Sequence, residues 1–310
     1  MKSLNDDISL INFLRNEELA ALKLRALYSC NGYIGWRMSK FEEYEFYIRN
    51  KDFLVSENVL TFTDVNGKLM ALKPDITLSI IRHMKDEPES LRKVFYDENV
   101  YRVSGNSKTF REIKQAGVEC VGAVTEREVS EIILLAADSL KLLAADKNIS
   151  LNISHLDLIA ELLAKLNLNL ETQNKIIKFI ADKNSHGIKE LCNSDELVKL
   201  ASLSGSYKAV MPELENIFSK NNLSLNNFKN IIKNLINKNS ELENILRIDF
   251  AAVSDLNYYN GLVFQGFIEG IPARILAGGQ YDKLMRRMGH KSGAVGFAVY
   301  LDMLDKSIRS

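Results

Sequence analysis

Residues 115–122 read QAGVECVG, and this stretch determines how the rest of the chain is interpreted. It closes a strand-like run, Arg111–Val121, which follows a second run of the same kind, Lys93–Tyr101. The segment between the two runs includes SGNSK at 104–108, a polar loop rich in turn-forming residues. Two such runs joined by a short polar loop predict a β-hairpin.

Polar side chains lie on this hairpin and on a segment before it. Gln115 and Glu119 are four residues apart, and an even separation on a strand places both side chains on one face. Arg102 directly follows the first run, and Asp75 and Thr77 follow an earlier hairpin. A free amino acid has an ammonium group that needs acceptors and a carboxylate that needs a cation or an N–H donor. Asp75, Glu119 and Arg102 supply both kinds, so the five residues could line one amino-acid pocket.

Each of these residues also has a purely structural interpretation, which the sequence leaves open. Asp75 is a good N-cap for the helix that follows it. Arg102 and Glu119 could form a cross-strand ion pair of little energetic weight. The tyrosine pair at 258–259 is typical of sheet packing, and Tyr281, after two glycines, could cap a turn.

The remaining pattern predicts a sheet interrupted by helices. Asn16 is a plausible N-cap for a first helix that runs to about Ser29, and Asn66-Gly67 predicts a tight hairpin turn. A capping box at 125–128 predicts a long helix. The further strand-like runs are Val59–Thr63, Lys68–Leu72, Leu246–Val253, Tyr258–Phe267, Ala273–Ala277 and Ala294–Ala298. We therefore predict an α+β fold, with an antiparallel sheet flanked by helices in residues 1–150 and 247–310 and an all-helical insertion domain in 151–246.

Composition excludes several classes of protein. The 310 residues are 46% hydrophobic and carry 40 basic and 40 acidic side chains, so no overall charge favours nucleic acid. The N-terminal ten residues contain two aspartates and no apolar core, and no segment approaches the roughly 20 apolar residues of a membrane span. The three cysteines form no C-x-x-C pair, which argues against a thiolate metal site: Cys30, Cys120 and Cys192. We expect a cytoplasmic protein with no cofactor and no bound metal.

Six segments resemble, in order, the signature segments of histidyl-tRNA synthetases. They are Leu72–Thr77, Tyr101–Arg102, Gln115–Gly122, Asn257–Phe264, Ala277–Asp282 and Gly293–Ala298. The resemblance implies a class II aminoacyl-tRNA synthetase fold and a histidine pocket formed by Asp75, Thr77, Arg102, Gln115, Glu119, Tyr258, Tyr259 and Tyr281. By the same resemblance, Asp75 and Glu119 hold the ammonium group and the three tyrosines surround the imidazole.

The sequence departs from the synthetase pattern where ATP is handled. Ser254 and Met303 stand where synthetases have arginines, and Ser104 replaces a glutamate. Only Arg111 remains of the usual arginines near that loop, and the chain stops at Ser310, which predicts no anticodon-binding domain. Adenylation needs positioned cations, and losing one such donor commonly costs about 3 kcal/mol. We therefore expect no synthetase activity.

A retained pocket with a degraded nucleotide site resembles the paralogues that regulate the short form of ATP phosphoribosyltransferase. The segments Leu203–Ser206 and Arg247–Phe250 also resemble them. The resemblance implies a non-catalytic partner of the catalytic ATP phosphoribosyltransferase subunit in the first step of histidine biosynthesis, with L-histidine as feedback effector. It further implies a dimer within a hetero-octamer and no nucleic-acid or membrane partner. The alternative is a truncated class II ligase that passes an amino acid to an acceptor other than tRNA; an RNA-binding module has no support in the charge balance.

Overall fold

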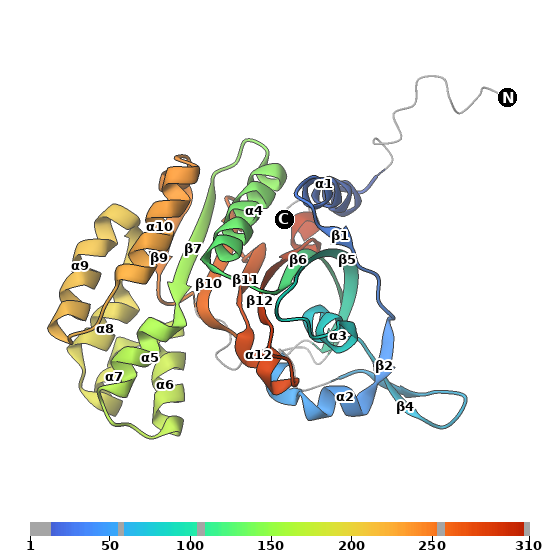
Figure 1. Ribbon diagram of the computed structural model, residues 1–310, viewed down its shortest axis with the longest axis horizontal. Helices are drawn as coiled ribbons and strands as arrows, with labels where there is room; N and C mark the ends of the chain where they lie inside the picture. The colour runs from blue at the N-terminus through green and yellow to red at the C-terminus, as the bar shows by residue number, and fades with distance from the viewer. Residues whose placement is uncertain (1–13, 55–58, 104–108, 253–257, 307–310) are drawn as a thin grey trace.

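The predicted central hairpin is present and contains the two longest strands of the structure. Strands β5 (Leu91–Val103) and β6 (Phe110–Gly122) pair antiparallel along their whole length, with Val94 opposite Glu119. The computed structural model describes residues 14–54, 59–103, 109–252 and 258–306. The predicted loop at 104–108 lies outside these ranges. The hairpin forms part of a nine-stranded sheet that runs through the middle of the molecule (Figure 1).

The large sheet is mixed, which corrects the prediction of a purely antiparallel one. Its order is β1-β5-β6-β12-β11-β10-β7-β9-β8, and the pairs β1–β5 and β7–β9 are parallel. Parallel neighbours need a crossover connection, and the helical segment 156–245 is the crossover from β7 to β9. The other strands of this sheet are β1 (Ile34–Gly35), β7 (Ile149–His155), β8 (Ser204–Ser206), β9 (Leu246–Asp249), β10 (Asn260–Ile268), β11 (Leu276–Gln280) and β12 (Gly293–Tyr300).

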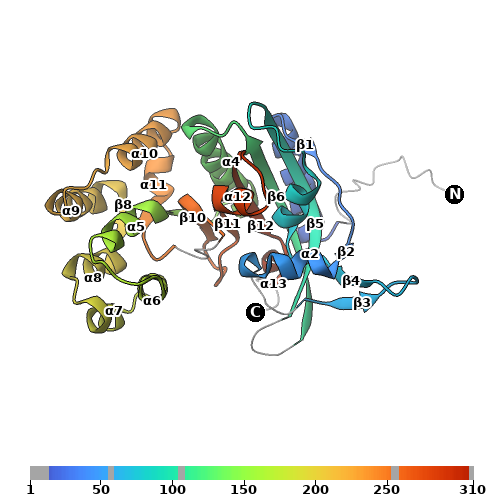
Figure 2. The ribbon, with the colours of Figure 1, turned by 60° about the horizontal axis from the view of Figure 1, so that its bottom comes forward.

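A small second sheet confirms the predicted first hairpin. Its strands are β2 (Phe41–Glu43), β3 (Thr61–Thr63) and β4 (Leu69–Leu72), in the order β2-β4-β3. Gly67 has φ of +80° in the β3–β4 turn, a conformation that glycine adopts without strain. Figure 2 shows this sheet at one side of the molecule, opposite the helices α6 to α9.

The helices confirm the predicted capping box and most of the predicted bounds. Thr125 and Glu128 bond reciprocally at the start of α4, but Arg15 rather than Asn16 is the N-cap of α1, because the side chain of Glu18 reaches back to the backbone N–H of Arg15. No helix within the described ranges is long and apolar enough to cross a membrane. The helices are α1 (Asn16–Cys30), α2 (Tyr44–Arg49), η2 (Lys51–Phe53), α3 (Ile76–His83), α4 (Glu126–Ala144), α5 (Leu156–Ala164), α6 (Leu170–Ala181), α7 (Ser185–Cys192), α8 (Asp195–Ser202), α9 (Tyr207–Lys220), α10 (Asn226–Lys238), α11 (Leu242–Ile245), α12 (Asp282–Arg287) and α13 (Asp302–Lys306).

The two faces of the sheet bury different sets of residues. On β6, Ala116, Val118 and Cys120 pack into the main core with α1 and α4. Val121 points the other way, into a smaller core that includes α3. Gln115 and Glu119 are separated from Val121 by even numbers of residues, so all three side chains point to the same face of the sheet. The predicted common face is therefore the one that α3 partly covers.

The helical segment joins the main core directly. Buried side chains of α6 to α10 belong to the same apolar cluster as those of α1 and α4. Between residues 156 and 245 the segment is helical apart from β8, three residues that pair with β9. Residues 151–155 of the predicted insertion belong to strand β7, and Leu246 begins β9. The division into two domains stays a prediction. Because β7 pairs with β10 as far as His155, we place the start of the inserted segment at residue 156 rather than 151.

Close strand packing makes Gly278 of β11 intolerant of a side chain. A Cβ there would lie 2.4 Å from the carbonyl oxygen of Gly296 and 2.5 Å from Cβ of Phe297. We expect Gly278→Ala to lower the free energy of unfolding by about 1–3 kcal/mol, measured by urea denaturation. The control is Gly35→Ala on the edge strand β1, where the nearest atom is a ring carbon of Phe95 at 3.3 Å. An equal effect of both substitutions would contradict this view of the packing.

Candidate functional site

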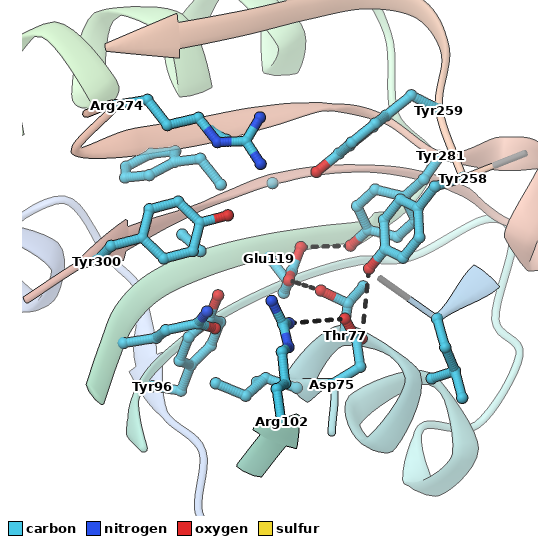
Figure 3. Close-up of a pocket in the computed structure, with 17 residues that line it drawn as sticks. Asp75, Thr77, Tyr96, Arg102, Glu119, Tyr258, Tyr259, Arg274, Tyr281 and Tyr300 are labelled. Atoms are coloured by element: carbon cyan, nitrogen blue, oxygen red, sulfur yellow. Dashed lines mark hydrogen bonds and ion pairs between the residues drawn. The ribbon is translucent and has the colours of Figure 1, made fainter. Parts of the chain in front are cut away.

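A cavity of about 180 Å³ opens on the face of the sheet that carries Gln115 and Glu119 (Figure 3). Every residue that the sequence singled out for the pocket lines it, although they come from five separate parts of the chain. The start of α3, the end of β5, the middle of β6, the segment before β10 and the residue after β11 contribute them. These residues are Asp75, Thr77, Arg102, Gln115, Glu119, Tyr258, Tyr259 and Tyr281. The structure therefore assembles the predicted set, and their role toward a ligand remains a proposal.

Glu119 is a carboxyl group buried without a cation. Its side chain is 2% exposed, and its two oxygens accept hydrogen bonds from the hydroxyls of Thr77 (2.6 Å) and Tyr281 (2.5 Å). Among the described residues no lysine or arginine pairs with it. Burial raises the pKa of Glu119 to about 8, and the nearby Asp75 contributes in the same direction. A cationic ligand group would supply the missing countercharge.

Asp75 combines the structural and the pocket role that the sequence left open. Its Oδ1 accepts from the backbone N–H of Leu78 at 2.9 Å, so it is the N-cap of α3, and it also lies 3.5 Å from the hydroxyl of Tyr258. Its Oδ2 lies 3.7 Å from the guanidinium of Arg102. Burial raises the pKa of Asp75, and the attraction of Arg102 opposes this shift without cancelling it.

Arg102 does not form the cross-strand pair with Glu119 that the sequence allowed. In the observed register Arg102 lies opposite Arg111, and Glu119 lies opposite Val94 near the other end of the hairpin. The side chain of Arg102 instead turns to α3, where its Nε donates to the carbonyl of Pro74 at 2.8 Å. The alternative of an ion pair between Arg102 and Glu119 is therefore wrong. Arg102 instead ties the end of β5 to the start of α3.

The three tyrosines form one wall of the cavity. The rings of Tyr258 and Tyr259 are 4.8 Å apart, and those of Tyr258 and Tyr281 are 6.1 Å apart. Tyr281 is 1% exposed and stands at the N-cap position of α12, but its side chain makes no capping bond there and points to Glu119 instead. Burial raises the pKa of all three hydroxyls well above 10, so they remain neutral hydrogen-bond donors. Such a wall suits a flat, polar ring.

Several lining residues were missed by the sequence reasoning. Tyr96 on β5, Arg274 before β11 and Tyr300 at the end of β12 all face the cavity. Gly296 lies opposite Glu119 in the β6–β12 ladder, and a Cβ at Gly296 would come within 1.8 Å of the Glu119 Oε2. The alternation of side chains along β12 could have identified some of them. Gly296, Ala298 and Tyr300 alternate with the core residues of that strand and so lie on the opposite face, toward the cavity.

Of the positions where the sequence departs from the synthetase pattern, the structure describes Met303, and it also describes the retained Arg111. Ser104 and Ser254 fall outside the described residues. Met303 of α13 packs against the main core. Arg111 of β6 lies 3.7 Å from Asp302, which is also in α13. Neither Met303 nor Arg111 lines the cavity.

The buried Glu119 should make stability depend on pH in the free protein. Its pKa of about 8 exceeds the unfolded value of 4.5, so between these values the folded state holds a proton that the unfolded state releases. Its contribution to stability is therefore full below pH 4.5 and is lost as pH rises toward 8, with a slope of at most about 1.4 kcal/mol per pH unit.

We expect Glu119→Gln to remove this contribution from urea denaturation curves measured between pH 5.5 and 8. The difference between wild type and variant isolates the one group. Glu161→Gln on the exposed side of α5 is the matched control and should keep the wild-type slope. If the free energy of unfolding changed with pH in the same way for wild type and Glu119→Gln, Glu119 would have the same pKa in the folded and the unfolded state, which would contradict this prediction.

Comparisons with known proteins agree along most of the chain. The family model for histidyl-tRNA synthetase matches residues 7–304. An ATP phosphoribosyltransferase regulatory subunit from Clostridium acetobutylicum is 30% identical over 299 residues, which cover 91% of this chain and 72% of the relative.

Solved structures share the fold. One is an ATP phosphoribosyltransferase regulatory subunit/histidyl-tRNA synthetase from Bacillus halodurans C, with a TM-score of 0.79 and 22% identity over 100% of this chain and 83% of that one. Another is an ATP phosphoribosyl transferase (HisG:HisZ) complex from Thermotoga maritima, with a TM-score of 0.71 and 20% identity over 92% and 97%. The predicted class II synthetase-like fold is confirmed. By its family match and its 30% identical relative, the chain belongs to the histidyl-tRNA synthetase family, in the group of ATP phosphoribosyltransferase regulatory subunits.

Proposed function

We propose that this chain is a non-catalytic regulatory subunit of ATP phosphoribosyltransferase, needed for the first step of L-histidine biosynthesis and for its feedback control by histidine. Support comes from relatives that carry this name and from the fold shared with a chain of an ATP phosphoribosyl transferase complex. The observation that carries the proposal is the cavity itself, in which a buried carboxyl group without a cation faces a wall of tyrosines. We place the protein in the cytoplasm with the rest of that biosynthetic step.

Histidine fits the chemistry of this cavity. Its ammonium group would pair with Glu119 and Asp75 and would replace the missing countercharge of Glu119. The hydroxyl of Thr77 and the side-chain amide of Gln115, which lies on the same face as Glu119, would serve as further polar contacts. The imidazole would lie against the tyrosine wall. A volume of about 180 Å³ suits a single amino acid.

Feedback control requires that histidine bind one state of the complex more tightly than another. Because separate parts of the chain supply the cavity wall, a ligand that contacts Asp75 of α3, Glu119 of β6 and Tyr281 before α12 would favour one relative position of these elements. We assign to this chain the step in which histidine binding stabilises that one arrangement. In our proposal the chain does so as a dimer that joins the catalytic subunit in a hetero-octamer.

The runner-up is a truncated class II ligase. It would need cations positioned on a triphosphate. Of the two arginines that line the cavity, Arg102 is held by Asp75 and the carbonyl of Pro74, so Arg274 alone would be left to meet a triphosphate. This arrangement favours a binding site over a site of nucleotide chemistry.

The regulatory role predicts a specific pattern in an activity assay. The catalytic chain encoded by the same organism should turn over ATP and phosphoribosyl pyrophosphate faster with this chain than without it, and histidine should inhibit only the assembled complex. The same preparation should show no histidine-dependent exchange of pyrophosphate into ATP. Robust exchange by the purified chain would establish the ligase instead.

The ammonium assignment predicts a loss of affinity in Glu119→Ala. Removing one partner of a buried charge pair weakens binding by about 2–5 kcal/mol, so the dissociation constant of L-histidine in calorimetry should rise at least about 30-fold. Glu161→Ala is the matched surface control. Unchanged histidine affinity in a folded Glu119→Ala protein would reject the assignment.

A further inference from the structure

The charges that line the cavity do not cancel in place. Two acidic and two basic side chains reach it, namely Asp75 and Glu119 against Arg102 and Arg274. Asp75 and Arg102 face each other at 3.7 Å. Across the residues that the structure describes, neither Glu119 nor Arg274 has a partner of opposite charge. One carboxyl group without a cation and one guanidinium without an anion therefore line the same small space.

Arg274 is held in place without using its hydrogen-bond donors. It belongs to the loop between β10 and β11, and its guanidinium carbon lies 5.9 Å from the ring centre of Tyr300. The backbone N–H of Tyr300 donates to the carbonyl of Ile275 at 2.8 Å, which fixes this loop to β12. Figure 3 shows the guanidinium beside Tyr259 and above Tyr300, on the far side of Glu119 from α3. A stacked guanidinium keeps its N–H edge free for an anion.

We propose that Arg274 binds the carboxylate of the free amino acid whose ammonium group Glu119 holds. This inference rests on the proposed function, since it takes the cavity as an amino-acid site, and it adds which end of the ligand meets which wall. The two unmatched charges then form a complement to a zwitterion. The site admits an amino acid with an unmodified carboxylate and rejects one whose carboxylate is reduced, esterified or amidated.

The chemistry of the guanidinium explains the selectivity. Its planar pair of N–H groups matches a carboxylate in two parallel hydrogen bonds, which are charge-assisted and strong. An alcohol at the same position leaves the cation unpaired in a partly buried site, and such unpaired groups give large discrimination factors. Arg102 is less suited to the task, because Asp75 and the carbonyl of Pro74 already engage it.

The test compares two ligands that differ only at the carboxylate, in full-length protein. Calorimetry with L-histidine and L-histidinol is performed on wild type, on Arg274→Met, which keeps the length of the side chain, and on Arg274→Lys, which keeps its charge. We expect wild type to bind histidine at least about 30-fold more tightly than histidinol, and Arg274→Met to lose most of this difference. The affinity for histidinol should change by less than about threefold, and Arg274→Lys should recover part of the preference.

Arg286→Met on the exposed side of α12 is the matched control and should behave as wild type. Thermal melting verifies that each variant is folded. If Arg274→Met weakens both ligands equally, or neither, while wild type binds histidine, the role of Arg274 is rejected and the amino-acid site stands. If wild type binds neither compound, the amino-acid site and the role of Arg274 are rejected together.

Discussion

The arrangement of this molecule around its cavity depends on one buried carboxyl group, that of Glu119. Two hydroxyls, from Thr77 at the start of α3 and Tyr281 before α12, hold its oxygens, so the group fixes two helix starts against the central strand β6. The neighbouring strand must carry glycine at 296, because any side chain there would occupy the space of the carboxylate. Desolvating a carboxyl group without a cation is costly, and a cationic ligand would relieve that cost.

The sequence predicted the face of the sheet that forms the site better than its full lining. The even separation of Gln115 and Glu119 placed both on one face, and the Asn-Gly turn and the capping box at 125–128 had local signals that the structure confirms. The sequence placed Arg274 in the strand-like run Ala273–Ala277, but β11 begins only at Leu276, so Arg274 lies in the loop before it. Its role was missed because the cavity that it lines is formed by residues distant in the sequence.

Local sequence patterns likewise could not predict that the sheet contains parallel pairs or which group Arg102 contacts. A strand run does not reveal whether its neighbour is parallel, and the pairing of β7 with β9 depends on how the helical segment between them returns to the sheet edge. Arg102 was expected either in the pocket or opposite Glu119. The register of the hairpin, with Arg102 opposite Arg111, decides between them, and register follows from tertiary packing.

We propose that a fold shared with synthetases here supports a site whose charges are arranged for an amino acid and not for its activation. The central claim is that histidine occupies this cavity when the regulatory complex is inhibited. The most direct measurement is a structure of the chain assembled with its catalytic partner and L-histidine. The account predicts histidine in the cavity, with its ammonium nitrogen about 3 Å from a carboxylate oxygen of Glu119 and its carboxylate beside Arg274. An empty cavity, with histidine bound between subunits, would contradict it.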